Sequence, residues 1–265
     1  DFSGASAFAQ LAISHDYHIA PLKEMIDRIH RHGAKMFIQL HHPGRQNIGL
    51  MMGTVPLSIA MERIMGKAYD RMFYKVAPFG KKLMEKDLVL KTWAPSKSPR
   101  AYSAESKNRE MSVHEIKKII QQFVDGAVRA KKAGADGVEL HAAHGYLIQQ
   151  FLSPYTNHRT DAYGGSLENR MRFLLEILQG IKSACGKDFP VIVRLTVDEC
   201  YKEIGREGVG YTLDEGVQMA KALDKAGVDA IDVSSASYDT YNYWLEPTSF
   251  EPGWRKYMAA AVKKE

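Results

Sequence analysis

Residues 138–172 read VELHAAHGYLIQQFLSPYTNHRTDAYGGSLENRMR. A short apolar strand is predicted to end in His141 and His144, three residues apart, and Tyr146 follows two residues later. A polar, glycine-bearing loop and then a helix are predicted after the tyrosine. Imidazoles at the C-terminal end of a strand, with a phenol just beyond, suit the polarising of a carbonyl and the delivery of a proton. Parallel α/β folds place their chemistry at such strand ends.

Strands and helices are predicted to alternate on both sides of this segment. The predicted helices cover residues 19–32, 112–133, 166–186 and 212–227, and the predicted strands cover 35–42, 137–141, 190–197 and 229–235. Two capping boxes are predicted, from Ser112 to Glu115 and from Thr212 to Glu215. Such alternation predicts right-handed βαβ units and a parallel sheet. The strands show little polar alternation, which is expected when both faces of a sheet are covered.

The α/β class is best matched by a (β/α)8 barrel. Polar residues fall at the C-terminal ends of successive strands, and no Rossmann glycine fingerprint opens a helix. Only about four central strand–helix units are clear, whereas a closed barrel of this kind needs eight strands. The chain starts at a helix and stops inside another, WRKYMAAAVKKE (254–265). We therefore expect residues 1–265 to form one barrel domain that is incomplete at both ends.

Residues 46–111 are predicted to form a long, lid-like insertion in this domain. The segment MERIMGKAYDRMFYKVAPFGKKLMEK (61–86) suggests one or two short amphipathic helices rich in methionine and aromatic residues. Connections of this length are uncommon unless they are functional or separately folded.

Composition limits the classes of partner. The net charge is +5, but basic residues are scattered among acidic ones, so we expect no nucleic-acid partner. The two cysteines, Cys185 and Cys200, make neither a disulfide framework nor a zinc site, and their scarcity suits a reducing cytoplasm. No apolar run approaches the length of a membrane span and no signal peptide leads the chain, so we expect a cytoplasmic protein without a membrane partner.

His141, His144 and Tyr146 are the candidate catalytic residues. The two histidines could be satisfied core residues or a metal-binding pair, but zinc hydrolases usually hold such a pair on a helix with a nearby glutamate. A substrate clamp fits better, because two N–H donors aimed at one carbonyl oxygen stabilise a developing enolate. Tyr146 is either an ordinary half-buried tyrosine or a general acid, since an ordinary phenol pKa of about 10 keeps it protonated at neutral pH.

Gln39 and Arg194 interrupt apolar strands. A buried arginine needs a partner, which is either a neighbouring carboxylate or the carbonyl oxygen of a cofactor. Gln39 can donate and accept at once, which suits the edge of a heterocycle. An aromatic run after the last strand either lines a hydrophobic substrate pocket or packs in the core; it comprises Tyr238, Tyr241, Tyr243 and Trp244. Ser234 lacks the context of a nucleophile elbow, so serine hydrolysis is not expected.

Three segments resemble motifs of the old yellow enzyme family of flavin-dependent ene-reductases. They are HAAHGYLIQQFLSPYTNHRTDAYGGSLENRMRF (141–173), FIQLHHPGR (37–45) and VIVRLTV (191–197). Within the family the chain is most similar to the longer bacterial branch, which includes 2,4-dienoyl-CoA reductase, 2-enoate reductase and bile-acid enone oxidoreductases. The resemblance implies a (β/α)8 flavin-binding barrel with non-covalent FMN, reduced by NADH or NADPH. It further implies hydride transfer from flavin N5 to the activated C=C of an enone or enoyl substrate, or the reverse desaturation.

The resemblance also implies roles for individual residues. The substrate carbonyl would rest between His141 and His144, with Tyr146 supplying a proton to the α-carbon and Tyr238 contacting the substrate. Gln39 would contact the pyrimidine edge of the flavin. Arg194 would contact its N1/C2 oxygen region, where a positive charge stabilises the anionic reduced flavin.

Other parts of the family pattern are expected outside this chain. The first two strands would lie upstream of Asp1 and the phosphate-binding loops beyond Glu265, as would any 4Fe–4S cluster or FAD of the longer branch. No metal is expected within the chain. Two rival hypotheses stay open: a non-flavin, metal-dependent barrel enzyme with His141 and His144 as ligands, and a catalytically incompetent fragment. A homo-oligomer is also left open.

Overall fold

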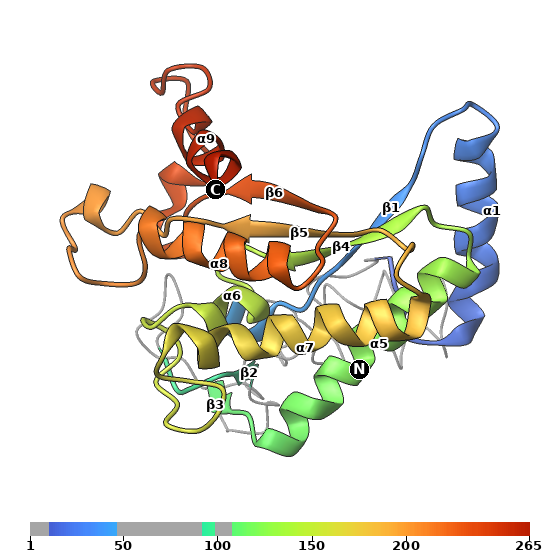
Figure 1. Cartoon of the computed structure of the whole chain (residues 1–265), viewed down its shortest axis with the longest axis horizontal. Helices are drawn as coiled ribbons and strands as arrows, with labels where there is room; N and C mark the ends of the chain where they lie inside the picture. Colours follow the sequence, from blue (N-terminus) through green and yellow to red (C-terminus); the bar gives the residue numbers. More distant parts are fainter. Residues whose placement is uncertain (1–10, 47–91, 99–107) are drawn as a thin grey trace, which may run out of the picture.

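Four parallel strands form the central sheet of the computed structural model, which describes residues 11–46, 92–98 and 108–265. The strands are β1 (Phe37–Leu40), β4 (Gly137–Ala142), β5 (Val191–Thr196) and β6 (Ala230–Ser234), and they lie in the order β1-β4-β5-β6 (Figure 1). Every neighbouring pair is parallel. The four predicted strands and the parallel sheet are therefore confirmed, and among the described residues the sheet does not close into a barrel.

Helices follow the strands as predicted. The helices of the described segments are α1 (Ile19–His30), α5 (Val113–Lys132), α6 (Leu147–Leu152), α7 (Leu167–Cys185), α8 (Leu213–Lys225) and α9 (Lys256–Lys264), with short 3-10 turns η2 (Asp16–His18), η3 (Gly44–Gln46), η4 (Lys202–Ile204) and η5 (Tyr238–Tyr243). The four predicted helices and the C-terminal one are confirmed. The short α6 was not predicted; it lies where a loop was expected, because all six of its residues are buried and tertiary packing outweighs the weak local signal.

The predicted capping box at Ser112 is confirmed. Its side chain accepts from Glu115 N, and the Glu115 carboxylate accepts from Ser112 N at 2.9 Å. Ser166 caps α7 in the same way, by accepting from Asn169 N. Both caps satisfy backbone N–H groups that the first turn of a helix leaves without a partner.

The predicted capping box at Thr212 is wrong, because its side chain makes no capping hydrogen bond. Glu215 turns away to pair with Arg170 at 2.8 Å. The carboxylate of Asp198, from the loop after β5, accepts instead from the N–H of Leu213 at 3.1 Å. The first turn of α8 is thus capped by a residue distant in sequence and not by Thr212.

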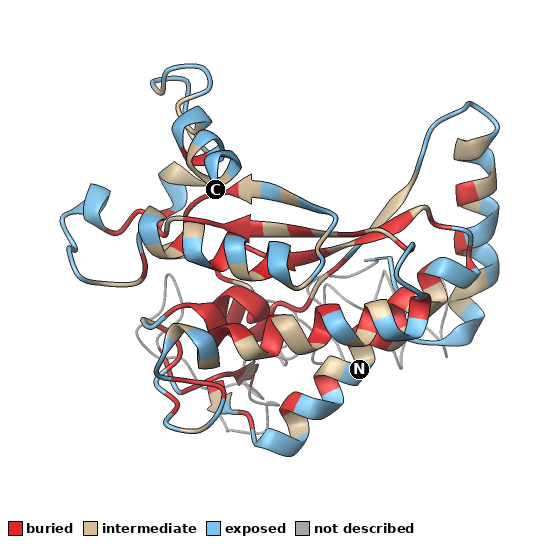
Figure 2. Ribbon diagram, in the orientation of Figure 1, coloured by how far each residue is buried: buried red, intermediate tan, exposed pale blue. Residues whose placement is uncertain are grey.

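Helices cover one face of the sheet, where the side chains are fully buried: Val138, Leu140, Val191, Val193 and Leu195. The helices α5 and α7 pack against this face, and their outer sides are exposed (Figure 2). The opposite face carries Gln39 and Asp232, both exposed, together with the half-buried Arg194. The prediction that both faces are covered is therefore wrong for the described residues. The polar side chains of these strands lie on the face that the described helices leave uncovered.

A second, two-stranded parallel sheet lies within the predicted insertion 46–111. It pairs β2 (Thr92–Ala94) with β3 (Asn108–Glu110). The amphipathic helices predicted at 61–86 lie outside the described residues. The prediction of an insertion stays a prediction for that part of the chain.

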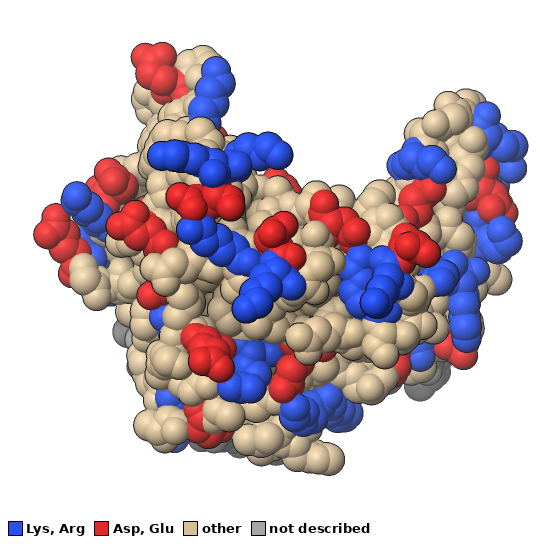
Figure 3. Space-filling view, in the orientation of Figure 1, with Lys and Arg blue, Asp and Glu red and all other residues tan. Residues whose placement is uncertain are grey.

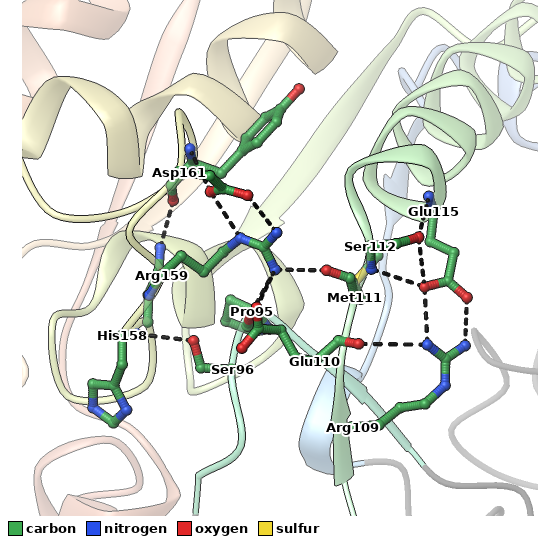
Figure 4. A network of polar contacts seen from close by, with 12 residues as sticks. Pro95, Ser96, Arg109, Glu110, Met111, Ser112, Glu115, His158, Arg159 and Asp161 are labelled. Carbon is green, nitrogen blue, oxygen red and sulfur yellow. Dashed lines mark hydrogen bonds and ion pairs between the residues drawn. The ribbon is translucent and has the colours of Figure 1, made fainter.

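Arg159, from the segment between α6 and α7, ties this small sheet to the main body (Figure 4). Its guanidinium donates to Pro95 O at 2.9 Å and to Met111 O at 2.6 Å, and it pairs with Asp161 at 2.6 Å. Nearby, His158 N donates to Ser96 Oγ at 2.9 Å. Because the guanidinium is almost fully buried, these contacts anchor the segment before α5 firmly to the loop that precedes α7.

Basic and acidic side chains intermingle on the face of the molecule in Figure 3. That face carries no single-sign patch of the kind that nucleic acid requires. Among the described helices, none combines the length and apolarity that a membrane crossing demands.

Candidate functional site

The predicted clamp and acid residues meet at the C-terminal end of the sheet. His141 lies near the end of β4, opposite Arg194 on β5. The ring centroids of His141 and His144 are 5.0 Å apart, and those of His141 and Tyr146 are 4.9 Å apart. The structure thus brings the three candidate catalytic residues together.

His41 completes this cluster, although it was not among the predicted site residues. Its ring lies 4.3 Å from that of Tyr146 and 5.3 Å from that of His141. A signal for it was present, because side chains two apart along a strand share a face. Gln39 and His41 therefore belong to the same side of the sheet.

His144 is held in a conformation that a residue with a Cβ rarely adopts. Its φ angle is +59°, which costs about 1–3 kcal/mol and needs a supporting environment. Nε2 lies 2.7 Å from Ser234 Oγ at the end of β6, and the backbone N–H donates to Thr196 Oγ1 at 3.2 Å. The ring stacks on Trp244 at 4.5 Å, with 19° between the planes. One nitrogen is thus engaged by the protein, which leaves Nδ1 as the nitrogen available to a ligand.

His141 differs from His144 in its polar contacts. Its Nδ1 atom is buried, and no described residue forms a hydrogen bond with it. An unsatisfied buried nitrogen is costly in the folded protein, so it marks a place where a ligand atom is expected. The described residues therefore leave His141 Nδ1 without the partner that a satisfied core histidine would have.

Tyr146 immediately precedes α6 and points its hydroxyl at a second phenol. The oxygens of Tyr146 and Tyr238 are 2.8 Å apart, and the two rings meet edge to face. Tyr238 comes from η5, directly after β6, so the two loops that follow β4 and β6 meet at this hydrogen bond. The predicted contact of Tyr238 with the substrate stays a prediction.

The cluster is uncharged at neutral pH. Burial lowers the pKa of His41 to about 4, of His141 to about 2 and of His144 to about 3. Burial also raises the pKa of Tyr146, and its hydrogen bond with Tyr238 adds to the shift. Each imidazole therefore offers one N–H donor and one acceptor nitrogen, and the phenol keeps its proton.

Arg194 has the partner that the sequence left open. Its Nε lies 3.2 Å from Asp232 Oδ2 on the neighbouring strand, and the side chain is 35% exposed. The same Nε atom is buried and makes no hydrogen bond to any described residue, so its N–H is not satisfied by the ion pair. Arg194 is therefore only partly buried, not fully buried as expected. The predicted alternative of a neighbouring carboxylate as its partner is confirmed by Asp232.

Gln39 is exposed on β1, not buried as the apolar strand suggested, because none of the helices described in the structure covers this face of the sheet. Its amide donates to the side chain of Glu139, its register partner on β4. Gln39 and Arg194 lie on the same sheet face as His141, since the pleat alternates side chains between faces.

The aromatic run after β6 divides between the site and the core. Trp244 stacks on His144 and Tyr238 contacts Tyr146, whereas Tyr241 is 42% exposed and packs on Trp244. Tyr243 instead packs against Trp254 and Phe250. The packing interpretation thus holds for Tyr243, and the substrate-pocket interpretation stays a prediction for Tyr238.

A buried carboxyl group beside the cluster escaped the sequence prediction. Glu199 accepts from Ser153 Oγ at 2.8 Å, from Tyr211 N at 2.9 Å and from Gln149 Nε2 at 3.3 Å. Burial raises its pKa to about 7. The sequence carried no signal for it, since Asp198 and Glu199 follow a strand as ordinary loop residues do.

Histidine and acidic side chains do not assemble into a candidate metal centre in the described segments, where no group of three or more His, Cys, Asp or Glu is arranged to hold an ion. In the histidine cluster, His144 Nε2 contacts Ser234 Oγ.

The family is settled by comparison with known proteins. The model of the NADH:flavin oxidoreductase / NADH oxidase family matches residues 2–261. The chain belongs to this family of oxidoreductases. The predicted resemblance to the old yellow enzyme family is thereby confirmed.

Two curated relatives illustrate the match. NADH oxidase of Thermoanaerobacter brockii is 42% identical over 262 residues, which are 98% of this chain and 34% of the relative. Cinnamate reductase of Clostridium sporogenes is 37% identical over 238 residues, which are 86% of this chain and 30% of the relative. The chain thus spans about a third of the length of these relatives.

Solved structures agree on the barrel class. A 2-naphthoyl-CoA reductase in complex with 2-naphthoyl-CoA has a TM-score of 0.73 at 27% identity, covering 99% of this chain and 35% of that one. Morphinone reductase in complex with tetrahydroNAD has a TM-score of 0.65 at 28% identity, covering 99% and 63%. The described sheet is the central part of such a barrel.

The polar face of the sheet fits a flavin. Arg194 Nε is a buried atom that the described residues leave without a hydrogen bond, and an acceptor atom of a bound group would satisfy it. A cation and an amide on one face also match a heterocycle that carries both carbonyl oxygens and N–H groups. Gln39 and Arg194 are the residues that would hold it.

Proposed function

We propose that the protein containing this chain is an FMN-dependent ene-reductase, which uses NADH or NADPH to reduce the activated C=C bond of an enone or enoyl substrate. The observation that carries the proposal is the unsatisfied His141 Nδ1 beside a protonated Tyr146 in one uncharged cluster. The names of two similar proteins, cinnamate reductase and 2-naphthoyl-CoA reductase, support a carbonyl-conjugated substrate.

His141 and His144 bind the substrate carbonyl in this proposal. Each is neutral, so each must present an N–H to a carbonyl oxygen. The hydroxyl of Ser234 contacts Nε2 of His144, and in the arrangement where it donates to Nε2 the ring carries its proton on Nδ1, which faces away from Ser234. Two such donors stabilise the negative charge that develops on the oxygen, by about 3 kcal/mol each in a site without water.

Tyr146 delivers the proton to the α-carbon. Its raised pKa keeps the proton in place until charge develops on the substrate. The edge-to-face contacts with His41 and Tyr238 hold the ring, so that the hydroxyl has little freedom to turn away.

Gln39 and Arg194 orient the flavin on the open face of the sheet. The flavin, when bound, supplies hydride transfer. Arg194 contributes a positive charge that favours a reduced, anionic ring, and Asp232 moderates that charge from 3.2 Å.

The domain organisation and compartment follow from the same proposal. Residues 1–265 belong to a single flavin-binding barrel domain, and any iron–sulfur cluster or FAD is bound outside this chain. Cys185 and Cys200 are free and buried, which agrees with a reducing cytoplasm.

The test uses the purified full-length protein under anaerobic conditions. Flavin released by denaturation is identified, and the bound flavin is reduced with NADH or NADPH and then mixed with cinnamate, cinnamoyl-CoA or a cyclic enone. The proposal expects FMN, bleaching by the nicotinamide, and one equivalent of flavin reoxidised per alkene reduced. Protein that carries a transition metal and no flavin, or reduced flavin that no unsaturated carbonyl compound reoxidises, would contradict it.

A further inference from the structure

Two buried glutamines bracket the residue that joins His144 to Tyr146. The N–H of Gly145 donates to Gln149 Oε1, and the carbonyl of Gly145 accepts from Gln150 Nε2 at 2.6 Å. Each glutamine side chain is 1% exposed. Both hydrogen-bonding groups of the linking residue are therefore fixed by side chains of the following helix.

The turn that they hold is not one that the backbone favours. His144 and Gly145 have φ angles of +59° and +75°, so two successive residues lie in the left-handed region. This conformation directs the ring of His144 and the ring of Tyr146 into the same cluster, where both contact His141. Buried peptide groups in such a turn need partners, and the glutamines supply them.

Gln150 is anchored by the loop after β1. Its Oε1 accepts from Arg45 N at 3.1 Å, and its Nε2 also donates to Pro43 O at 3.2 Å. The loop makes room for it at Gly44, where a Cβ would come within 2.4 Å of Gln150 Oε1. The hydrogen bonds with Arg45 N and Pro43 O fix the orientation of the amide, so its nitrogen faces the carbonyl of Gly145.

Gln149 is anchored by the buried carboxyl group of Glu199. Gln149 Nε2 donates to Glu199 Oε1 at 3.3 Å, while Glu199 Oε2 accepts from Ser153 Oγ and Tyr211 N. The backbone N–H of Gly145 can only donate, so the oxygen of the Gln149 amide faces Gly145 and its nitrogen faces Glu199.

We propose that Gln149 and Gln150 are positioning residues, which hold the Gly145 turn so that His144 and Tyr146 act on one substrate, and that Glu199 orients Gln149. This inference rests on the proposed function. There, His144 binds the carbonyl oxygen and Tyr146 protonates the α-carbon, two atoms that a single carbon separates. A small shift of either ring relative to the other therefore removes one of the two contacts.

The first test is Gln149→Glu in the FMN-loaded protein. The new carboxylate still accepts from Gly145 but has no N–H to donate to Glu199, and in an assay at about pH 9, where Glu199 is ionised, the two carboxylates repel each other. We expect the reoxidation of reduced flavin by the alkene to slow about 10- to 100-fold, the scale that small misplacements of reacting groups produce. Reduction of the flavin by the nicotinamide is expected to change little. Gln179→Glu, at an exposed position of α7, is the matched control and should leave both steps unchanged.

A charge-swapped pair tests the orientation directly. In Gln149→Glu combined with Glu199→Gln, the new amide at 199 donates to the new carboxylate, and its oxygen still accepts from Ser153 and Tyr211. We expect the pair to recover to within about threefold of the parent, because the two sites are directly coupled. If the single variants lose their flavin, the pair still decides the point: an alkene step more than about tenfold slower than in the parent would overturn the inference.

The second test places Gln150→Glu in the parent and in a Tyr146→Phe background. The new carboxylate cannot donate to Gly145, so we expect a selective loss in the parent and less than about a threefold further loss once the phenol is absent. An equal loss in both backgrounds, or in both half-reactions, indicates a purely structural role and overturns the inference. If Tyr146→Phe alone leaves the alkene step unchanged, the proposed function fails as well. If Tyr146→Phe slows that step while both glutamine variants are silent, this inference alone fails.

Discussion

The phenol oxygens of Tyr146 and Tyr238 lie 2.8 Å apart and join the loop after β4 to the loop after β6. Either hydroxyl can donate in this pair. Tyr238 therefore influences both how firmly Tyr146 holds its proton and how a phenolate at Tyr146 is stabilised. Ring contacts of His41 and Trp244 enclose the pair.

Tyr238→Phe is expected to slow alkene reduction about fivefold, the effect of one neutral hydrogen bond of about 1 kcal/mol. The loss is modest because Tyr238 supports the acid and does not itself donate to the substrate. Stopped-flow reoxidation of the reduced flavin by an enone measures it, with Tyr241→Phe, at an exposed position, as the control. A loss as large as that of Tyr146→Phe would instead make Tyr238 the proton donor.

Ser234→Ala is expected to weaken substrate binding more than turnover. Without the hydroxyl, Nε2 of His144 loses its hydrogen-bond partner and the ring is held less firmly, so KM for the enone should rise about 3- to 10-fold. Ser235→Ala is a matched control, because Ser235 is equally buried but donates to Tyr243 O at 2.7 Å, away from the histidines. An unchanged KM in Ser234→Ala, or an equal rise in both variants, contradicts the role given to Ser234.

Arg194 and Asp232 are expected to shift the flavin midpoint potential in opposite directions. Arg194→Gln removes a positive charge from the anionic reduced flavin and should lower the potential by about 30–60 mV, equivalent to about 1.4–2.8 kcal/mol for two electrons. Asp232→Asn frees the same charge from its partner and should raise the potential. Anaerobic redox titration measures both variants, and shifts of the same sign would place the flavin elsewhere.

Glu199 is expected to make the protein less stable as the pH rises. Its pKa is about 7 in the folded protein against 4.5 in an exposed carboxyl, mainly through burial, with repulsion from Asp239 and attraction from Arg45 as opposing influences. The folded state thus binds the proton more tightly. The free energy of unfolding should fall between about pH 4.5 and 7, by up to about 3 kcal/mol, and level off above.

Denaturant unfolding of the parent and of Glu199→Gln, at about pH 5 and about pH 8, isolates this contribution. Between about pH 5 and about pH 8 the parent should lose about 1–3 kcal/mol more of its free energy of unfolding than Glu199→Gln does. Glu207→Gln, at an exposed position, should behave as the parent does. Identical pH dependence in the parent and Glu199→Gln would mean that the carboxyl group titrates normally.

The regular elements were predictable because their signals are local. Apolar periodicity and the capping serines fixed α5 and α7, and the apolar runs fixed the four strands. The cap at Thr212 was not predictable, since Asp198 replaces it from another strand loop. The helix α6 was missed for a similar reason, because its six buried residues depend on tertiary contacts.

The candidate site was predicted in its chemistry but only partly in its contacts. His141, His144 and Tyr146 follow from their position at a strand end, and the structure places them together. The partners of these residues come from segments far apart in sequence. No spacing rule joins Tyr146 to Tyr238, 92 residues away, or His144 to Ser234, 90 residues away. The exposure of Gln39 likewise depends on which face of the sheet the helices cover.

The rate of each half-reaction in Tyr146→Phe tests the central claim most directly. The proposed role predicts that reduction of the flavin by NADH or NADPH proceeds at nearly the parent rate, while reoxidation by the alkene slows about 100-fold or more, as loss of a general acid does. Stopped-flow absorbance of the flavin resolves the two steps separately. Equal slowing of both steps, or an alkene step at the parent rate, would contradict the account.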